Sequence, residues 1–99
     1  MIKHVVLLNW KEGVSQEEID LVGLEFGKLR NEIKEIVAYQ FGPDAGIYKG
    51  NASYALVADF ETEATFKTYV THEKHLAFLA DITGPILESF QSAQFLVDA

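Results

Sequence analysis

The sequence predicts an α+β domain of the ferredoxin-like type, with elements in the order β-α-β-β-α-β. Three observations support this prediction: two stretches have the apolar spacing of an amphipathic helix, four short stretches alternate like strands, and 99 residues leave no room for a second core. In this topology, right-handed crossovers place both helices on one face of a four-stranded antiparallel sheet. We therefore expect residues 1–99 to form one domain.

The first half of the chain contains a strand, a helix and a second strand. Residues 2–10 (IKHVVLLNW) alternate between two faces and are rich in β-branched side chains, which predicts a strand. Ser15 and Glu18 have the spacing of a capping box, and apolar residues then recur every three or four positions as far as Ile33, which predicts a helix. Residues 36–42 (IVAYQFG) predict the second strand.

The second half supplies the remaining two strands. Residues 43–51 contain a proline and two glycines and predict a loop. Residues 53–61 (SYALVADFE) alternate clearly and predict the third strand, and residues 91–98 (QSAQFLVD) predict the last one.

The second helix is expected to be interrupted. Thr62 can cap its N-terminus, and the helix should bend near residues 71–72 before a further helical piece that starts at about Lys74. Gly84 and Pro85 should interrupt that piece, because proline lacks the amide proton that a helix interior needs.

One face of the predicted sheet has no helix to cover it. Val5, Leu7 and Val57, with Phe95 or Val97, point to this face, and a soluble monomer rarely exposes so large an apolar patch. A second copy related by a two-fold axis is the commonest cover, so the pattern predicts a homodimer.

Composition excludes several classes of partner and site. The net charge of −7 argues against nucleic acid and anionic membranes as partners, and the chain has no cysteine for a disulfide or a thiolate. The first strand is too short and polar for a signal peptide or a membrane span. A cytoplasmic location is expected.

Residues 66–75 (FKTYVTHEKH) concentrate the groups that can do chemistry near neutral pH. On a continuous helix, Tyr69, His72 and His75 would share one side because they are three residues apart. Two hypotheses stay open here. His75 could act as a general base beside a hydrogen-bonding Tyr69, or the two side chains could satisfy each other or backbone carbonyls at a helix junction.

The sequence resembles the stress-responsive A/B barrel (Dabb) domain family, a branch of the dimeric α+β barrels. The similar segments are residues 3–19 (KHVVLLNWKEGVSQEEI), the turn at Gly42, residues 69–75 (YVTHEKH) and the closing residues 96–98 (LVD), which together span the chain. The usual family form of the third segment is His-Pro-x-His, whereas this chain has Glu73 at the proline position.

The resemblance implies a pocket between the helices and the sheet. Family members include plant polyketide cyclases, in which a tyrosine and the second histidine of the motif act in this pocket. An aldol closure by these two groups needs no cofactor, so we expect neither a cofactor nor a metal here. By this likeness Tyr69 and His75 take the catalytic positions and His4 lines the pocket. A tyrosine on the first helix of the cyclases is replaced here by Phe26. The full set of expected pocket-lining residues is His4, His72, Trp10 and Phe26.

Three functions remain as hypotheses. The first is a protein that binds a small aromatic or polyketide-like ligand in an apolar pocket and carries out cyclase- or lyase-type proton transfer on it. The second is a stress-associated dimeric module that binds a ligand or has a structural role and catalyses no reaction. The third is a cofactorless monooxygenase. A cavity that contains both Tyr69 and His75 would favour the first hypothesis, and a filled one the second.

Overall fold

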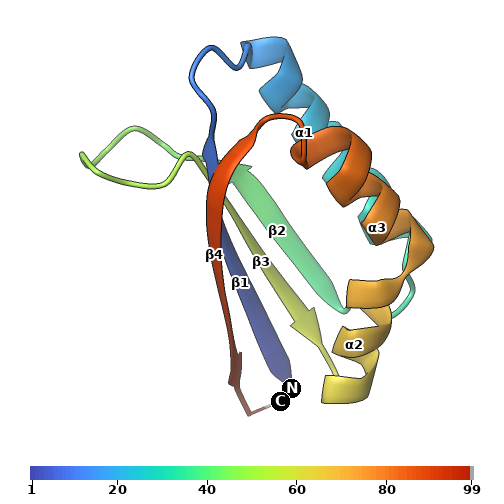
Figure 1. The fold of residues 1–99 in the computed structure, drawn as a ribbon. Coiled ribbons are helices and arrows are strands. Elements are labelled where there is room, and N and C mark those ends of the chain that lie inside the picture. Colours follow the sequence, from blue (N-terminus) through green and yellow to red (C-terminus); the bar gives the residue numbers. More distant parts are fainter. Residues whose placement is uncertain (99) are drawn as a thin grey trace.

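The computed structural model describes residues 1–98 and confirms the predicted ferredoxin-like fold (Figure 1). In chain order, the elements are β1 (Ile2–Trp10), α1 (Gln16–Glu32), β2 (Ala38–Pro43), β3 (Tyr54–Phe60), α2 (Glu63–Thr71), α3 (Glu73–Phe78), the π-helical turn η1 (Leu79–Thr83) and β4 (Leu87–Leu96). None of the helices in residues 1–98 combines the length and the hydrophobicity that spanning a bilayer requires.

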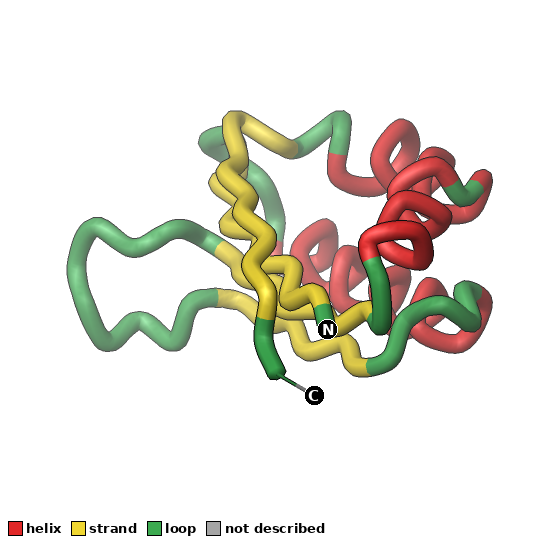
Figure 2. Tube along the Cα trace, turned by 90° about the horizontal axis from the view of Figure 1, so that it is seen from below, coloured by secondary structure: helices red, strands yellow, loops and turns green. Residues whose placement is uncertain are grey.

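The four strands form one antiparallel sheet in the order β2-β3-β1-β4, so β1 and β3 are central. All helices lie on one face of this sheet (Figures 1 and 2). The register places His4 between Ala58 on β3 and Gln94 on β4. Side chains directly opposite each other in neighbouring strands point to the same face, so His4 and Gln94 both point toward the helices.

Helix α1 begins at the predicted capping box and packs along the sheet. The Ser15 hydroxyl accepts a hydrogen bond from the Glu18 amide at 3.2 Å, and the Glu18 carboxylate accepts one from the Ser15 amide at 3.0 Å. These bonds satisfy amide groups that the first helical turn leaves free. Val22, Phe26 and Leu29 are the buried residues of the helix, and their spacing of four and three forms the stripe that faces the core.

The second helical region breaks at His72, as predicted. Helix α2 ends at Thr71, and His72 is extended, with φ −62° and ψ 135°. The Nδ1 atom of His72 accepts a hydrogen bond from the Lys74 amide at 3.1 Å and so caps α3, whose first residue is Glu73. Tyr69 and His75 therefore lie on two separate helices rather than on one continuous helix.

Strand β4 begins at Leu87, four residues before the predicted start. Its register with β1 shifts between Asn9 and Trp10: Asn9 lies opposite Ser89, but Trp10 lies opposite Leu87. Glu88 is the extra residue of this bulge, and one extra residue reverses the alternation of the strand. The bulge turns Leu87 to the same side as Phe90. It also interrupts the regular alternation from which the start of the strand was predicted. Strand β2 also begins two residues later than predicted.

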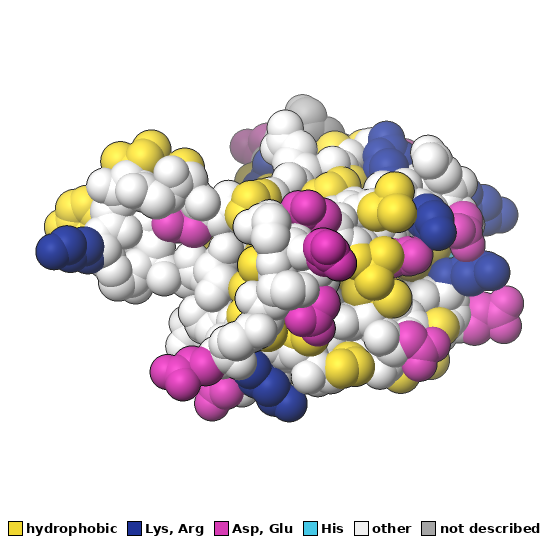
Figure 3. All heavy atoms as spheres, turned by 90° about the horizontal axis from the view of Figure 1, so that it is seen from above, with side chains coloured by type: hydrophobic (Ala, Val, Ile, Leu, Met, Phe, Trp, Pro, Cys, Tyr) yellow, Lys and Arg dark blue, Asp and Glu magenta, His cyan; other side chains and the backbone are white. Residues whose placement is uncertain are grey.

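The face of the sheet opposite the helices is uncovered and partly apolar. Val5 and Val57 are half-buried there, and Leu7 and Phe95 are exposed. The loop of residues 44–53, here called the arm, extends away from the sheet on the side opposite the helices (Figure 2). The space-filling view shows the arm standing out from the body, with hydrophobic and basic side chains at its end (Figure 3).

Candidate functional site

A cavity of about 540 Å³ lies between the sheet and the helices α2 and α3. Its volume is within the range of small-molecule binding sites. Most of the wall is apolar, and among the described residues it includes no Asp, Glu, Lys or Arg. The polar groups that line it are those of His4, Tyr69, His75, Thr83, Ser92 and Gln94.

The structure brings four of the six predicted site residues to this cavity. His4 enters from β1, Phe26 from α1, Tyr69 from α2 and His75 from α3. Their convergence depends on the break at His72, which lets α3 carry His75 back over Tyr69. The centroids of the Tyr69 and His75 rings are 4.3 Å apart.

His75 presents an unprotonated nitrogen. Its Nδ1 lies 3.0 Å from the carbonyl oxygen of Val70. A carbonyl oxygen can only accept a hydrogen bond, so Nδ1 carries the proton and Nε2 carries a lone pair. Burial lowers the pKa of His75, the bond to Val70 opposes this effect, and the nearby His72 lowers the pKa further. The ring is therefore neutral at pH 7, with Nε2 able to accept a proton.

Tyr69 is paired with a second tyrosine, Tyr39, whose role could not be predicted from the sequence. The hydroxyl oxygens of Tyr69 and Tyr39 are 2.7 Å apart. Burial raises the pKa of Tyr69 to about 12 against the opposing effect of this hydrogen bond, and burial also raises the pKa of Tyr39. One hydroxyl donates to the other, so the neutral pair keeps one proton for a further hydrogen bond. Tyr39 and Phe41 are two residues apart on β2 and therefore point to the same face of the sheet. The sequence did not show whether this face is the one that the helices cover.

His4 is held by Gln94, a residue of the last strand. The Nδ1 atom of His4 lies 2.9 Å from the amide nitrogen of Gln94, which is directly opposite in the β1–β4 register. The His4 ring packs on Phe66, with 4.9 Å between centroids. Burial, and to a lesser extent the nearby His75, lowers the pKa of His4 to about 4. His4 is therefore neutral at physiological pH.

Two predicted pocket-lining residues, His72 and Trp10, are absent from the wall of the cavity that residues 1–98 form. The His72 ring is used to cap α3. Trp10 lies at the bulged end of β1 and packs on Tyr54, with 5.7 Å between ring centroids. The described part of the chain contains no cluster of three side chains that could bind a metal ion.

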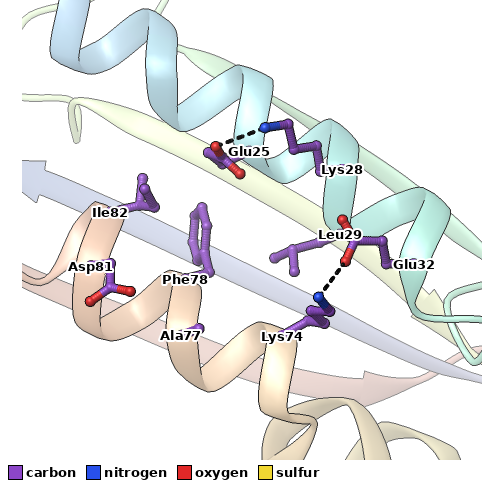
Figure 4. A pocket seen from close by; sticks show the side chains of 9 residues that line it. All are labelled: Glu25, Lys28, Leu29, Glu32, Lys74, Ala77, Phe78, Asp81 and Ile82. Carbon is purple, nitrogen blue, oxygen red and sulfur yellow. Dashed lines mark hydrogen bonds and ion pairs between the residues drawn. The ribbon is translucent and has the colours of Figure 1, made fainter.

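A second, shallower hollow of about 350 Å³ lies on the outer side of the helical layer, between α1 and α3 (Figure 4). Its rim is charged and carries two ion pairs, Lys28 with Glu25 at 3.2 Å and Lys74 with Glu32 at 3.5 Å. Phe78 lines both hollows. The hollow is thus the seam where α3 packs on α1. Of the two ion pairs, Lys74–Glu32 joins these helices, whereas Lys28 and Glu25 both lie on α1.

Comparison with known proteins gives a consistent result. Residues 2–97 match the family described as the Stress responsive A/B Barrel Domain. The chain is 29% identical over 87 residues to the stress-response A/B barrel domain-containing protein HS1 of Arabidopsis thaliana, covering 86% of this chain and 80% of that protein.

Solved structures share the whole fold. A dimeric ferredoxin-like protein of unknown function from Thermobifida fusca YX has a TM-score of 0.90 and 35% identity, covering 97% of this chain and 90% of that chain. A hydroxynitrile lyase from Passiflora edulis has a TM-score of 0.85 over 98% of this chain and 93% of its own. Its identity is 22%, and at that level the similarity shows the fold alone.

Proposed function

The chain belongs to the stress responsive A/B barrel domain family, and on that premise we propose that it binds a small aromatic or polyketide-like molecule in the 540 Å³ cavity and transfers a proton on it without a cofactor. The observation that carries this proposal is the unprotonated Nε2 of His75 at the wall of an apolar cavity, beside a protonated Tyr69.

The proposed reaction uses the two groups in one step. Nε2 of His75 removes a proton from a carbon next to a carbonyl group, and the electron pair of the broken C–H bond moves onto the carbonyl oxygen. The remaining hydroxyl proton of the Tyr39–Tyr69 pair donates a hydrogen bond to that oxygen. The apolar wall strengthens this bond, because few water molecules compete for it.

The proposal includes a homodimer that buries the uncovered face of the sheet. The related T. fusca protein is described as dimeric. The apolar side chains of β1, β3 and β4 on that face support the same assembly here.

The test uses 5-nitrobenzisoxazole, a bicyclic aromatic carbon acid that needs only a base. Removal of its C3 proton breaks the N–O bond and releases the coloured 2-cyano-4-nitrophenolate. At pH 7 we expect the wild-type protein to accelerate this release with saturation, and His75→Asn to reduce kcat/KM by roughly a hundredfold. His72→Asn is the matched control, because asparagine is a good helix cap and His72 lies off the cavity wall.

Binding without chemistry is the second candidate, favoured by the predominance of apolar residues in the wall. Under this alternative the probe binds, but its ring opening is the same for wild type, His75→Asn and His72→Asn. Equal rates for the three proteins would therefore remove the catalytic part of the proposal and leave a binding module.

A further inference from the structure

We propose that Gln94 is a positioning residue, which holds His4 with its ring proton on the nitrogen that faces the cavity. His4 then acts as a hydrogen-bond donor, and the site selects neutral ligands that carry an acceptor oxygen such as a ketone. The ligand class rests on the proposed function of the cavity, whereas the role of Gln94 rests on the geometry of the sheet.

His4 and Gln94 are opposite residues of β1 and β4, and 2.9 Å separates the Gln94 amide nitrogen from Nδ1 of His4. An amide nitrogen can only donate, so Nδ1 accepts this hydrogen bond. A neutral imidazole carries a single proton, and that proton is therefore on Nε2 of His4.

His4 lines the cavity, and no protein group in residues 1–98 forms a hydrogen bond with its Nε2. The ring is fixed against Phe66 and is 6.2 Å from the Tyr69 ring, centroid to centroid. The Nε2–H group of His4 is thus left for a ligand. His75 has the opposite tautomer, so one histidine presents a donor and the other an acceptor.

The described wall has no cationic side chain, and both of its histidines are neutral at pH 7. A carboxylate would lose its hydration without gaining a counter-ion, and that cost is large in an apolar site. A ketone oxygen loses much less hydration and can accept the Nε2–H bond of His4. The wall therefore favours a neutral carbonyl compound over its acid analogue.

The tautomer of His4 can be measured directly by NMR on ¹⁵N-labelled protein, through the couplings of the two ring nitrogens to the carbon-bound ring protons. We expect Nε2–H in the wild type and Nδ1–H in Gln94→Glu, because a carboxylate can only accept. Gln94→Met should leave a mixture of both. Gln16→Glu, an exposed substitution at the start of α1, is the control and should keep Nε2–H. Nδ1–H in the wild type, or one tautomer unchanged in all variants, would overturn the role of Gln94.

The ligand class is tested with three matched naphthalenes: 2-acetylnaphthalene, 2-isopropenylnaphthalene, in which C=CH₂ replaces C=O, and 2-naphthoate. By titration at pH 7 we expect the ketone to bind roughly three- to tenfold more tightly than the alkene, as one neutral hydrogen bond predicts, and the carboxylate to bind most weakly. Gln94→Glu should weaken the preference for the ketone over the alkene, because only the hydroxyl proton of the Tyr39–Tyr69 pair then remains to donate to the carbonyl oxygen. Tighter binding of 2-naphthoate, or no preference for the ketone in the wild type, would overturn the inference.

These outcomes differ from a failure of the proposed function. Loss of catalysis alone would appear as equal ring opening by wild type and His75→Asn, with the His4 tautomer and the ketone preference intact. A failure of the further inference would leave the dependence on His75 unchanged and would alter only the NMR result or the order of affinities.

Discussion

At the scale of single residues, the cavity shows how a hydrogen bond to a ring nitrogen decides what a histidine can do. Val70 accepts from His75 and leaves it a base, while Gln94 donates to His4 and leaves it a donor. Neither histidine needs a charge for these roles. Burial lowers the pKa of both histidines, so both rings are neutral, and two neutral rings can lie near each other without charge repulsion.

The lowered pKa of His4 predicts a pH-dependent stability. In the unfolded chain this pKa is about 6.5, and in the folded protein it is about 4. Between these values the unfolded state binds a proton that the folded state does not, so the free energy of unfolding falls as the pH falls from 6.5 toward 4. A pKa difference of one corresponds to about 1.4 kcal/mol. Multiplying the pKa difference by this energy gives an upper limit. Because water can reach the ring from the cavity, we expect the free energy of unfolding to fall by roughly 2 kcal/mol, which is less than that limit.

The measurement is urea unfolding of wild type and His4→Gln at pH 7 and at about pH 4.5, at one protein concentration. Carboxylates contribute equally to both proteins, so the difference between their losses reports His4. The wild type should lose roughly 2 kcal/mol more than His4→Gln. Equal losses would show that His4 is as easily protonated in the folded protein as in the unfolded chain.

The pair formed by Tyr39 and Tyr69 predicts a non-additive double-mutant cycle. Tyr39→Phe or Tyr69→Phe alone leaves the other hydroxyl unpaired in a largely buried place, which costs about 1–2 kcal/mol of the free energy of unfolding. The double variant removes both hydroxyls, so its cost should be smaller than the sum of the two by about 1 kcal/mol. Urea unfolding of the four proteins gives the coupling energy, and strict additivity would contradict the 2.7 Å contact.

Residue types and their spacing predicted part of this site. Tyr69 and His75 could be identified because both belong to one short motif, and His4 because the resemblance to the family places it on the pocket wall. Gln94 and Tyr39 could not, since each matters only through a partner far away in the chain: Gln94 through the β1–β4 register and Tyr39 through a tyrosine 30 residues later. Their roles follow from tertiary packing.

At the scale of elements, the break between α2 and α3 is the feature that makes the site, because it turns His75 over Tyr69. The two sides of the break are built differently. Helix α2 ends at Thr71, and His72 supplies the cap for α3 with its own ring. The break does not depend on proline. Glu73 occupies the position at which the family usually has a proline, and the turn forms without a proline.

The geometry of the break predicts that Glu73→Pro is tolerated and stabilising. Glu73 is the first residue of α3, a position that proline favours, and the extended backbone of His72 suits the residue before a proline. Proline also restricts the unfolded chain, which typically adds 0.4–1 kcal/mol, less about 0.3 kcal/mol for the carboxylate lost from the helix start. We expect a net gain of roughly 0.5 kcal/mol in the free energy of unfolding.

Lys74→Pro is the control for that prediction, one residue later. The Lys74 amide donates to the His72 ring, and proline has no amide proton, so the capping hydrogen bond of α3 would be lost. We expect a loss of about 1 kcal/mol or more. Thermal and urea unfolding measure both variants, and equal destabilisation by the two prolines would contradict the cap described here.

The last strand shows why element boundaries were harder to predict than element types. Regular alternation identified residues 91–98, but the bulge at Glu88 interrupts the alternation and places Leu87 with Phe90 on the cavity side. Nothing local in the sequence marks such a bulge. It is imposed by pairing with the far end of β1, and it supplies two residues of the cavity wall.

At the scale of the whole molecule, the sheet separates two surfaces of different character. One face carries the cavity and is covered by helices, and the other presents β1 and β3 without cover (Figure 2). The arm extends on this uncovered side, and two large side chains at its end, Ile47 and Tyr48, are 87% and 78% exposed. In a homodimer built through the sheet, the arm would reach the second copy. The proposed homodimer would therefore account for the exposure of these two side chains in the single chain.

This arrangement predicts that a charge on the uncovered face separates the dimer, whereas the same charge on the helical face does not. Leu7 is exposed near the centre of the uncovered face, so Leu7→Lys would bury an unpaired ammonium group at the interface, at a cost of several kcal/mol. Leu24 is 60% exposed on α1, on the helical side, and Leu24→Lys is the matched control. In sedimentation at micromolar concentration, wild type and Leu24→Lys should move as twice the chain mass and Leu7→Lys as one chain. A wild type that sediments as one chain would remove the dimer, and dissociation by both lysines would show that charge in general, rather than this face, controls assembly.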